Sequence, residues 1–233
     1  MILLITRPTD PLVAALRAAL APGAVAVMDV ETGPLASWHF EPGAAERSAL
    51  VVDGRRVVAG ELTAVLSRLP WVDPARLEAI VPDDRAYVAA ETSASLVAWL
   101  AALPCPVLNR PTPACLVGPA WAPQQWALAA ARAGLRVAAV EERAARGGRC
   151  AEAAPSPVRA TRATVTVVGG RCVGEVAPAL VAGALRLATE ARVALLGVSF
   201  DGAEADAHFL GATPTPDLDT PAALHALVAR LRG

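Results

Sequence analysis

The sequence contains no lysine, since all 21 of its Lys+Arg residues are arginine. A chain without lysine has no amine for Schiff-base chemistry and no ammonium group that burial could turn into a base near neutral pH. A phosphate-binding loop of the G-x-x-x-x-G-K-[ST] type is excluded as well, because its lysine contacts the nucleotide phosphates. Arginine is therefore the only side chain in this sequence that carries a permanent positive charge.

Charge and long hydrophobic runs are also scarce. Only 18% of the 233 residues are charged, although 55% are hydrophobic and the mean hydropathy is +0.44. No apolar run approaches the roughly 20 residues that cross a bilayer, and the start lacks the basic leader of a signal peptide. The net charge of -1, without a basic block, disfavours nucleic acid as a partner. We therefore expect a soluble cytoplasmic protein that binds neither membrane nor nucleic acid.

The familiar catalytic and metal-binding motifs are absent. The four cysteines include no C-x-x-C pair, which predicts free thiols, and the three histidines lack the spacing of a zinc site. The sequence has no G-x-S-x-G elbow, and no G-x-G-x-x-G follows the first expected strand. Three carboxylates gather in one turn that we expect to be solvated rather than metal-binding, namely Asp201, Glu204 and Asp206. The sequence thus predicts no metal and identifies no catalytic residue.

The first part of the chain opens as a βαβ unit. Residues 2–6 predict a strand, Asp10-Pro11 predicts the start of a helix to residue 21, and residues 24–30 predict a second strand. Asp53-Gly54 indicates a hairpin between short strands at 49–52 and 56–58. Further on we expect a strand or half-turn at 62–66, a helix at 85–103 that Asp83-Asp84 caps, and a strand at 107–109.

A proline-rich passage at 111–123 separates this part from the rest. The second part predicts a helix at 122–133 with Gly134 just beyond its end, and a hairpin that turns through Gly169-Gly170. Residues 142–161 lack periodicity and predict a loop. The remaining expected elements are strands at 135–140, 193–200 and 207–210, and helices at 178–188 and from Thr220-Pro221 to 232.

Several segments carry a resemblance to a known family. They are AVLSRLPWVD at 64–73, VLNRP at 107–111, AGLRV at 133–137, TVTVVGG at 164–170 and FLGATP at 209–214. In this order they resemble the strands and turns of ATP-grasp ligases of the RimK-like and microviridin-type (graspetide) peptide ligases. The resemblance implies an α/β fold, with a Rossmann-like pre-ATP-grasp domain at 1–112 and a truncated, reduced ATP-grasp-like α+β domain at 113–233.

The sequence departs from that family where the ligases hold Mg²⁺ and ATP. Aligned by motif, the metal-binding Asp, Glu and Asn of the family fall on Ser199, Gly211 and Thr213. The two lysines that grip the nucleotide are missing, and the segment that would carry them is reduced to 138–161. Arginine can bind phosphate, but it cannot replace the oxygen ligands that Mg²⁺ requires. The resemblance therefore implies a degenerate site without a nucleotide cofactor.

The family positions that remain lie in the first part of the chain. Four polar residues match there, and we expect them to bind a ligand at the strand ends of an open sheet, namely Arg68, Glu91, Asn109 and Arg110. The alternative is a structural ion pair between Glu91 and either Arg68 or Arg110. Trp71 and Trp126, together with Trp121, are candidates for an aromatic wall against a peptide, and plain packing is the alternative.

These observations favour a catalytically degenerate ATP-grasp-like protein that binds a peptide or a partner protein. The resemblance alone connects it with the biosynthesis of peptide natural products. The alternative is an active enzyme, either an ATP-dependent carboxylate-amine ligase with an atypical site or an ATP-independent catalyst that uses Cys172, His208 or Glu91. A homo-oligomer whose interface accounts for the high hydrophobicity is a third possibility.

Overall fold

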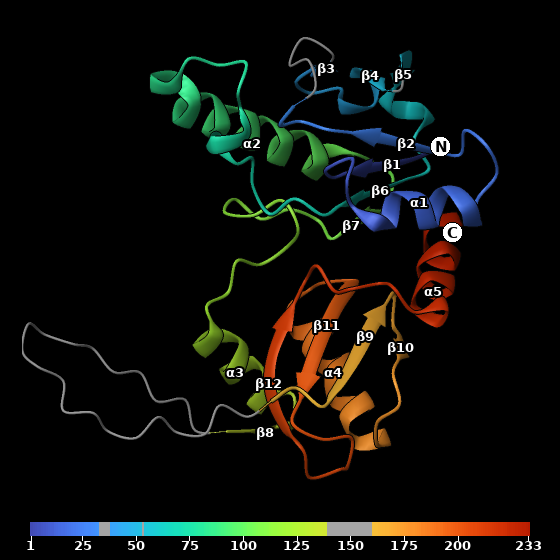
Figure 1. Ribbon diagram of the computed structural model, residues 1–233, viewed down its shortest axis with the longest axis vertical. Coiled ribbons are helices and arrows are strands. Elements are labelled where there is room, and N and C mark those ends of the chain that lie inside the picture. The colour runs from blue at the N-terminus through green and yellow to red at the C-terminus, as the bar shows by residue number, and fades with distance from the viewer. Residues whose placement is uncertain (33–37, 53, 139–159) are drawn as a thin grey trace, which may run out of the picture.

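The computed structural model describes residues 1–32, 38–52, 54–138 and 160–233. Three sheets form the framework: a parallel sheet in the order β2-β1-β6-β7, a small antiparallel sheet β3-β4-β5, and a mixed sheet in the order β10-β9-β11-β12-β8. Figure 1 shows the first two sheets in one half of the molecule and the mixed sheet in the other. The α/β class expected from the sequence is confirmed, whereas the predicted loop at 142–161 lies almost wholly outside the described residues.

The parallel sheet is built from short, buried strands. Its members are β1 (Ile2–Ile5), β2 (Val25–Met28), β6 (Ala64–Ser67) and β7 (Val107–Leu108). Successive side chains of a strand point to opposite faces of the sheet. Leu3 and Ile5 accordingly pack in one cluster with helix α2 (Arg85–Ala102), while Ile2 and Leu4 pack in another with helix α1 (Pro11–Ala19). Helices therefore cover both faces, as expected for a parallel sheet.

The small antiparallel sheet contains the predicted hairpin. Its strands are β3 (Trp38–His39), β4 (Ala49–Val52) and β5 (Arg55–Val58), and β4 pairs with β5 from Ala49↔Val58 to Val52↔Arg55. Short 3-10 turns follow in the same half, at Ala45–Arg47, Ala59–Glu61, Pro74–Arg76 and Pro82–Asp84. The predicted capping of α2 is corrected at Asp84, which precedes the helix but makes no side-chain capping bond.

The mixed sheet packs against two helices. Its strands are β8 (Arg136–Val137), β9 (Ala163–Val168), β10 (Arg171–Val173), β11 (Leu195–Phe200) and β12 (His208–Thr213). Helices α3 (Pro123–Arg132) and α4 (Pro178–Glu190) share one apolar cluster with β9 and β11. The predicted hairpin is confirmed: Gly169 and Gly170 connect β9 to β10 with φ of 55° and 85°, the left-handed conformation that a two-residue type I′ turn requires.

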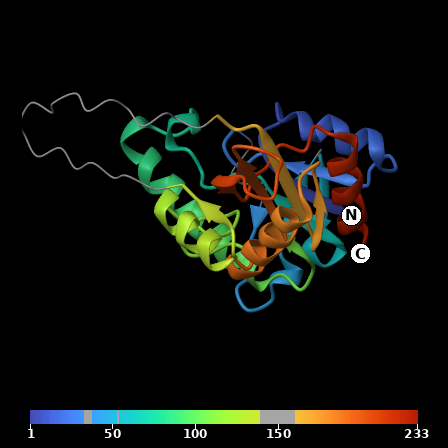
Figure 2. The same cartoon turned by 90° about the horizontal axis from the view of Figure 1, so that it is seen from below.

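The last helix, α5 (Pro221–Arg232), joins the two halves. The Thr220 hydroxyl accepts a hydrogen bond from the Ala223 amide at 3.2 Å, which confirms the predicted cap. Leu227 and Leu231 are buried in the same cluster as Ile2 and Leu4 of β1, and Figures 1 and 2 show α5 beside α1. This cluster draws residues from both sides of the predicted boundary at 112/113, so the division into those two domains stays a prediction.

Candidate functional site

The carboxyl edge of the parallel sheet holds a polar network around Asp10. This residue caps α1 by accepting a hydrogen bond from the Leu12 amide at 3.0 Å. The same carboxylate accepts from the Thr6 hydroxyl at 2.8 Å and from Arg68 Nε at 2.7 Å. Burial raises the pKa of Asp10, but the hydrogen bonds from Leu12, Arg68 and Thr6 outweigh it and leave the pKa below its ordinary value.

Arg68 also reaches the other half of the molecule. Its Nη1 donates to the carbonyl oxygen of Pro216 at 2.9 Å, beyond the end of β12. The Arg68 and Asp10 side chains are only 16% and 11% exposed. The guanidinium is therefore occupied by a carboxylate in its own half and by a backbone carbonyl in the opposite half, which is the arrangement of a structural joint.

Asn109 forms the second part of this joint. Its Nδ2 lies within hydrogen-bonding distance of three backbone carbonyls, those of Val117 at 3.2 Å, Leu195 at 2.8 Å and Pro214 at 3.3 Å. Its Oδ1 accepts from the amides of Ala194 and Leu195, both at 2.8 Å. The side chain is 2% exposed and ties the end of β7 to the start of β11. We call Arg68, Asp10 and Asn109, with the backbone groups they bind, the joint between the two halves.

Arg110 and Glu91 lie apart from this joint. The two terminal nitrogens of the Arg110 guanidinium donate to backbone carbonyls at and just past the end of α2, at 3.1 to 3.2 Å, namely those of Leu100, Ala101, Leu103 and Cys105. Glu91 is exposed on α2 and has no ion pair within the part of the chain that the structure describes. The alternative of a structural ion pair between Glu91 and Arg68 or Arg110 is not what the structure shows, because each arginine has other partners.

The candidate tryptophans separate by exposure. Trp126 is 5% exposed and packs edge to face against Trp121, with ring centroids 4.7 Å apart. Trp71 follows β6 and is 60% exposed, while the amide of the next residue, Val72, donates a hydrogen bond to Ser93 Oγ on α2 at 3.1 Å. The structure thus places Trp126 in the core of the second half, and it places Trp71 at the surface beside α2.

The three positions matched to metal ligands do come together. In the antiparallel pair of β11 and β12, Ser199 lies opposite Gly211, and Thr213 lies opposite Gly197. They supply two hydroxyls and no carboxylate, whereas Mg²⁺ is held in proteins mainly by carboxylate and carbonyl oxygens together with water. Among the described residues, no group of three or more His, Cys, Asp or Glu side chains is placed to hold a metal ion. The residues at these positions do not fit the metal that the family would place there.

Two residues named for an alternative chemistry lie in strands of the same sheet, His208 in β12 and Cys172 in the edge strand β10. His208 Nδ1 lies 3.3 Å from Asp201 Oδ2, and Asp201 Oδ1 accepts from the His208 amide at 2.7 Å. Cys172 is half-buried, and burial raises the pKa of its thiol. A thiol with a raised pKa carries little thiolate near neutral pH and is a poor nucleophile.

One polar cluster escaped the sequence analysis. The fully buried Glu31 side chain pairs with Arg7 at 2.7 Å and with Arg76 at 3.0 Å, and it accepts from the Asp73 amide at 3.1 Å. Hydrogen bonding to Glu31 raises the pKa of Arg7 against the opposing effect of burial. Glu31 follows β2 as Arg7 follows β1, so adjacency of the two strands was the signal that could have revealed this pair.

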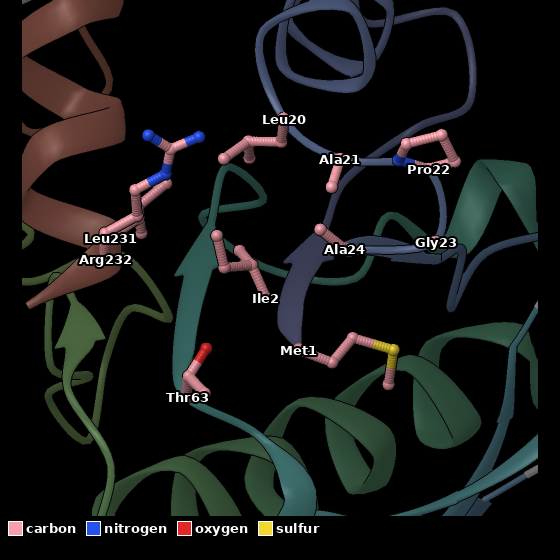
Figure 3. Close-up of a pocket in the computed structure, with 10 residues that line it drawn as sticks. All are labelled: Met1, Ile2, Leu20, Ala21, Pro22, Gly23, Ala24, Thr63, Leu231 and Arg232. Atoms are coloured by element: carbon pink, nitrogen blue, oxygen red, sulfur yellow. The ribbon is translucent and has the colours of Figure 1, made fainter.

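Two pockets lie away from the residues described so far. One of about 500 Å³ opens at the amino edge of the parallel sheet, between the turn at 20–24 and the end of α5. Figure 3 shows its mainly apolar lining, with Arg232 as the only charged side chain among the residues drawn. The other, of about 680 Å³, lies beside the β9–β10 turn and includes Arg192 and Arg230 in its wall.

Comparisons with known structures identify the fold. The macrocyclase MdnC of Microcystis aeruginosa MRC, solved with its precursor peptide MdnA, superposes with a TM-score of 0.70 at 14% identity over 100% of this chain and 99% of that chain. The ATP-grasp ligase PsnB, complexed with a minimal precursor, Mg and ADP, gives 0.66 at 15% identity over 99% and 97%. A RiPP-associated ATP-grasp ligase of Chryseobacterium gregarium, in complex with ADP and leader and core peptides, gives 0.62 at 11% identity over 93% and 90%.

The fold is therefore ATP-grasp-like over the full length of the chain. No protein-family model matches the sequence, and no curated protein matches it significantly. The predicted truncation of the second half stays a prediction, since the match spans nearly all of MdnC. In the described residues, no helix has both the length and the apolar character needed to cross a membrane.

Proposed function

We propose that this protein binds a peptide and does not carry out ATP-dependent ligation, acting in the biosynthesis of a modified peptide. The observation that carries the proposal is the paired β11–β12 site, where Ser199, Gly211 and Thr213 offer no carboxylate. The similar ligases MdnC and PsnB were solved with precursor peptides. Binding a peptide is the part of their behaviour that this chain's residues still support.

The argument against nucleotide use is electrostatic. Phosphoryl transfer depends on positioning and on neutralising the charge of the phosphates, which metal ions and basic side chains provide. This chain has no lysine, and its candidate metal positions supply only two hydroxyl groups. Arginine could bind a phosphate, but a triphosphate without its cation would keep most of its repulsion. We therefore propose that no nucleotide cofactor acts here.

The peptide would contact the exposed members of the predicted site. Arg68, Asn109 and Arg110 are engaged with backbone groups of the protein itself. Trp71 and Glu91 remain exposed, and the hydrogen bond from Val72 to Ser93 holds the Trp71 segment along the helix that carries Glu91. An exposed indole and an exposed carboxylate on this half of the molecule favour a peptide segment with an apolar and a basic side chain.

Titration calorimetry with Mg-ATP tests the lack of a nucleotide site. The proposal expects no saturable heat with Mg-ATP, Mg-ADP or ATP alone. Micromolar binding that requires Mg²⁺ would instead establish the protein as a ligase with an atypical site. A triple variant, Ser199→Asp with Gly211→Glu and Thr213→Asn, serves as the matched comparison, because it restores the oxygen ligands without restoring the lysines.

Peptide binding is tested with the product of a precursor gene that neighbours the gene for this chain. Trp71→Ala and Glu91→Ala should each weaken binding by roughly fivefold to tenfold, and a double-mutant cycle measures their coupling. Leu128→Ala is the control, since Leu128 is 55% exposed on α3. Equal affinity in all three variants would place the peptide elsewhere.

A second function rests on the pair of His208 and Asp201. A carboxylate 3.3 Å from an imidazole nitrogen orients the ring and supports proton transfer by its other nitrogen. This favours an ATP-independent reaction in the second half, with His208 as the proton carrier. His208→Gln would then abolish turnover of the bound peptide, detected by mass spectrometry, while leaving its affinity intact. A peptide that stays unmodified with the wild-type protein removes this second function.

A further inference from the structure

The pocket of about 680 Å³ beside the β9–β10 turn has an unusual lining. Arg192, just past the end of α4, and Arg230, on α5, both belong to its wall, and no Asp or Glu does. Neither guanidinium makes a hydrogen bond or ion pair with another residue in the described part of the chain. Two arginines thus border one cavity whose size falls within the range of small-molecule sites.

Arg230 is held in place by the glycine of the turn. A Cβ added to Gly169 would lie 2.4 Å from Arg230 Cδ and 3.1 Å from its Cγ. The aliphatic part of the arginine therefore crosses directly over the glycine backbone, where no other residue leaves room. Gly169 is also in the left-handed region with φ of 55°, which favours glycine at this turn. The contact places the stem of Arg230 beside the pocket.

Arg192 is held in a backbone conformation that is unfavourable for its type. It has φ of 53°, the only non-glycine residue with positive φ in the described ranges. It lies just past α4, at the position where helices usually end on glycine. The amides of Arg192 and Val193 satisfy the carbonyls of Thr189 and Ala188, both at 3.0 to 3.1 Å. An arginine at a position that favours glycine, on the wall of a pocket, indicates that its guanidinium has a functional role.

Helix-end electrostatics give a competing explanation. Arg230 lies in the last turn of α5 and Arg192 follows α4, and positive charge is favourable at the carboxyl end of a helix. That explanation accounts for each arginine alone. It does not account for two guanidiniums without protein partners on the wall of one cavity. An anion in the cavity would give both of them a partner.

We propose that this pocket binds a small oxyanion, a phosphate or carboxylate group, between the guanidiniums of Arg192 and Arg230. The planar guanidinium donates two parallel hydrogen bonds to either group, which makes arginine suited to both. The backbone of the Gly169-Gly170 turn completes the polar part of the wall, because the Thr189 hydroxyl donates its proton to the Leu185 carbonyl at 2.9 Å. The site lies at the opposite end of β9 from Arg162 and does not depend on the proposed peptide function.

Binding is measured on the full chain at constant ionic strength, by calorimetry and by the shift in Tm, with inorganic phosphate and with succinate as probes. The proposal expects saturable binding of at least one probe. Binding of phosphate alone would identify a phosphoryl site, and binding of both would identify a general oxyanion site. Lack of saturable binding of either probe at millimolar concentration overturns the proposal.

Variants then separate a local site from the overall charge. Arg192→Ala and Arg230→Ala should each weaken binding about tenfold, because each removes one bidentate contact. Arg192→Gly is decisive, since it should lower affinity to the same degree while leaving Tm unchanged or raised at this left-handed position. Arg162→Ala removes the same charge from the far end of β9 and should leave affinity unchanged. Equal losses in Arg162→Ala and Arg192→Ala would reduce the effect to bulk charge and sink the proposal.

Discussion

The joint between the two halves and the pocket beside the β9–β10 turn use arginine in opposite ways. In the joint, Arg68 is 16% exposed and divides its donors between Asp10 and the carbonyl of Pro216. In the pocket, Arg192 and Arg230 have no protein partner among the described residues. In a chain without lysine, the residue type therefore says nothing about the role. The number of donors already engaged separates structural arginines from those available to a ligand.

This contrast explains why family-matched positions gave a mixed prediction of the site. Arg68 and Asn109 lie at the strand ends where an open parallel sheet presents polar groups. In this protein, however, the second half of the chain supplies the groups that bind them, through Leu195, Pro214 and Pro216. Arg68 and Asn109 do follow strand ends, but the groups that they bind there are backbone groups of the protein itself.

Replacing Asn109 by alanine should have the largest effect on the joint. The change removes two amide hydrogens shared among three carbonyls and an oxygen that accepts from two amides, and it leaves those buried groups without this partner. Each buried polar group without a partner costs about 1 to 3 kcal/mol, so we expect a loss of about 3 kcal/mol in the free energy of unfolding after partial relaxation. Chemical denaturation measures it. Gln125→Ala, which removes an exposed helix-capping bond of 2.7 Å, is the control and should cost below about 1 kcal/mol.

Arg68→Ala should come next, with a loss of about 2 kcal/mol. It leaves the Asp10 carboxylate, only 11% exposed, without its charged partner. A double-mutant cycle with Asp10→Asn should show coupling of about 1 kcal/mol or more, since the two side chains are in direct contact. Strict additivity of the two single changes would show that the joint does not act as a unit.

The pH dependence of stability reports the same contact. The pKa of Asp10 is lowered in the folded protein, so its contribution is complete above the unfolded value of about 3.9 and is lost as the pH falls through the folded pKa. Stability should therefore decline below about pH 4. Asp10→Asn should flatten that decline in denaturation curves recorded from neutral to acidic pH. An unchanged acid limb in this variant would assign the decline to other carboxylates.

Arg110 tests an intermediate case, because its guanidinium is engaged only by the carboxyl end of α2. Arg110→Ala removes donors to four carbonyls and favourable positive charge at a helix end, although the residue is exposed. The cost should be about 1 kcal/mol, smaller than for Arg68. Arg110→Lys separates the two terms, since it keeps the charge but loses the planar array of donors. A full rescue by lysine would make the charge the dominant contribution.

Local patterns predicted most of the elements but not the joint. Asp10-Pro11, Gly169-Gly170 and Thr220-Pro221 each mark a cap or turn whose physics is confined to neighbouring residues, and all three fall where expected. The partner of Asp10 is 58 positions away in Arg68, and no local pattern specifies that distance. The same holds for α5, whose apolar residues were readable but whose return to β1 was not.

The candidate site shows the same difference between local patterns and contacts between distant parts of the chain. The register sets Ser199 opposite Gly211 in neighbouring strands, while their match to the metal-binding positions of the ligases stays a prediction. Trp71 and Trp126 looked equivalent in sequence, yet one is 60% and the other 5% exposed. Exposure depends on what packs from elsewhere in the chain, and for Trp126 this is Trp121 together with the β9 and β11 strands.

The smallest expected effect belongs to an arginine at the rim of the second region. Arg171 is exposed at the start of β10 and borders a smaller cavity of about 200 Å³ that also includes Arg230. Arg171→Thr introduces a residue that favours strands and should change the free energy of unfolding by less than about 0.5 kcal/mol. If Arg171 assists the neighbouring anion pocket, added phosphate should stabilise the wild-type protein more than the Arg171→Thr variant. A loss of 2 kcal/mol without any anion would instead place Arg171 with Arg68 among the structural arginines, and the contrast between the two regions would fail.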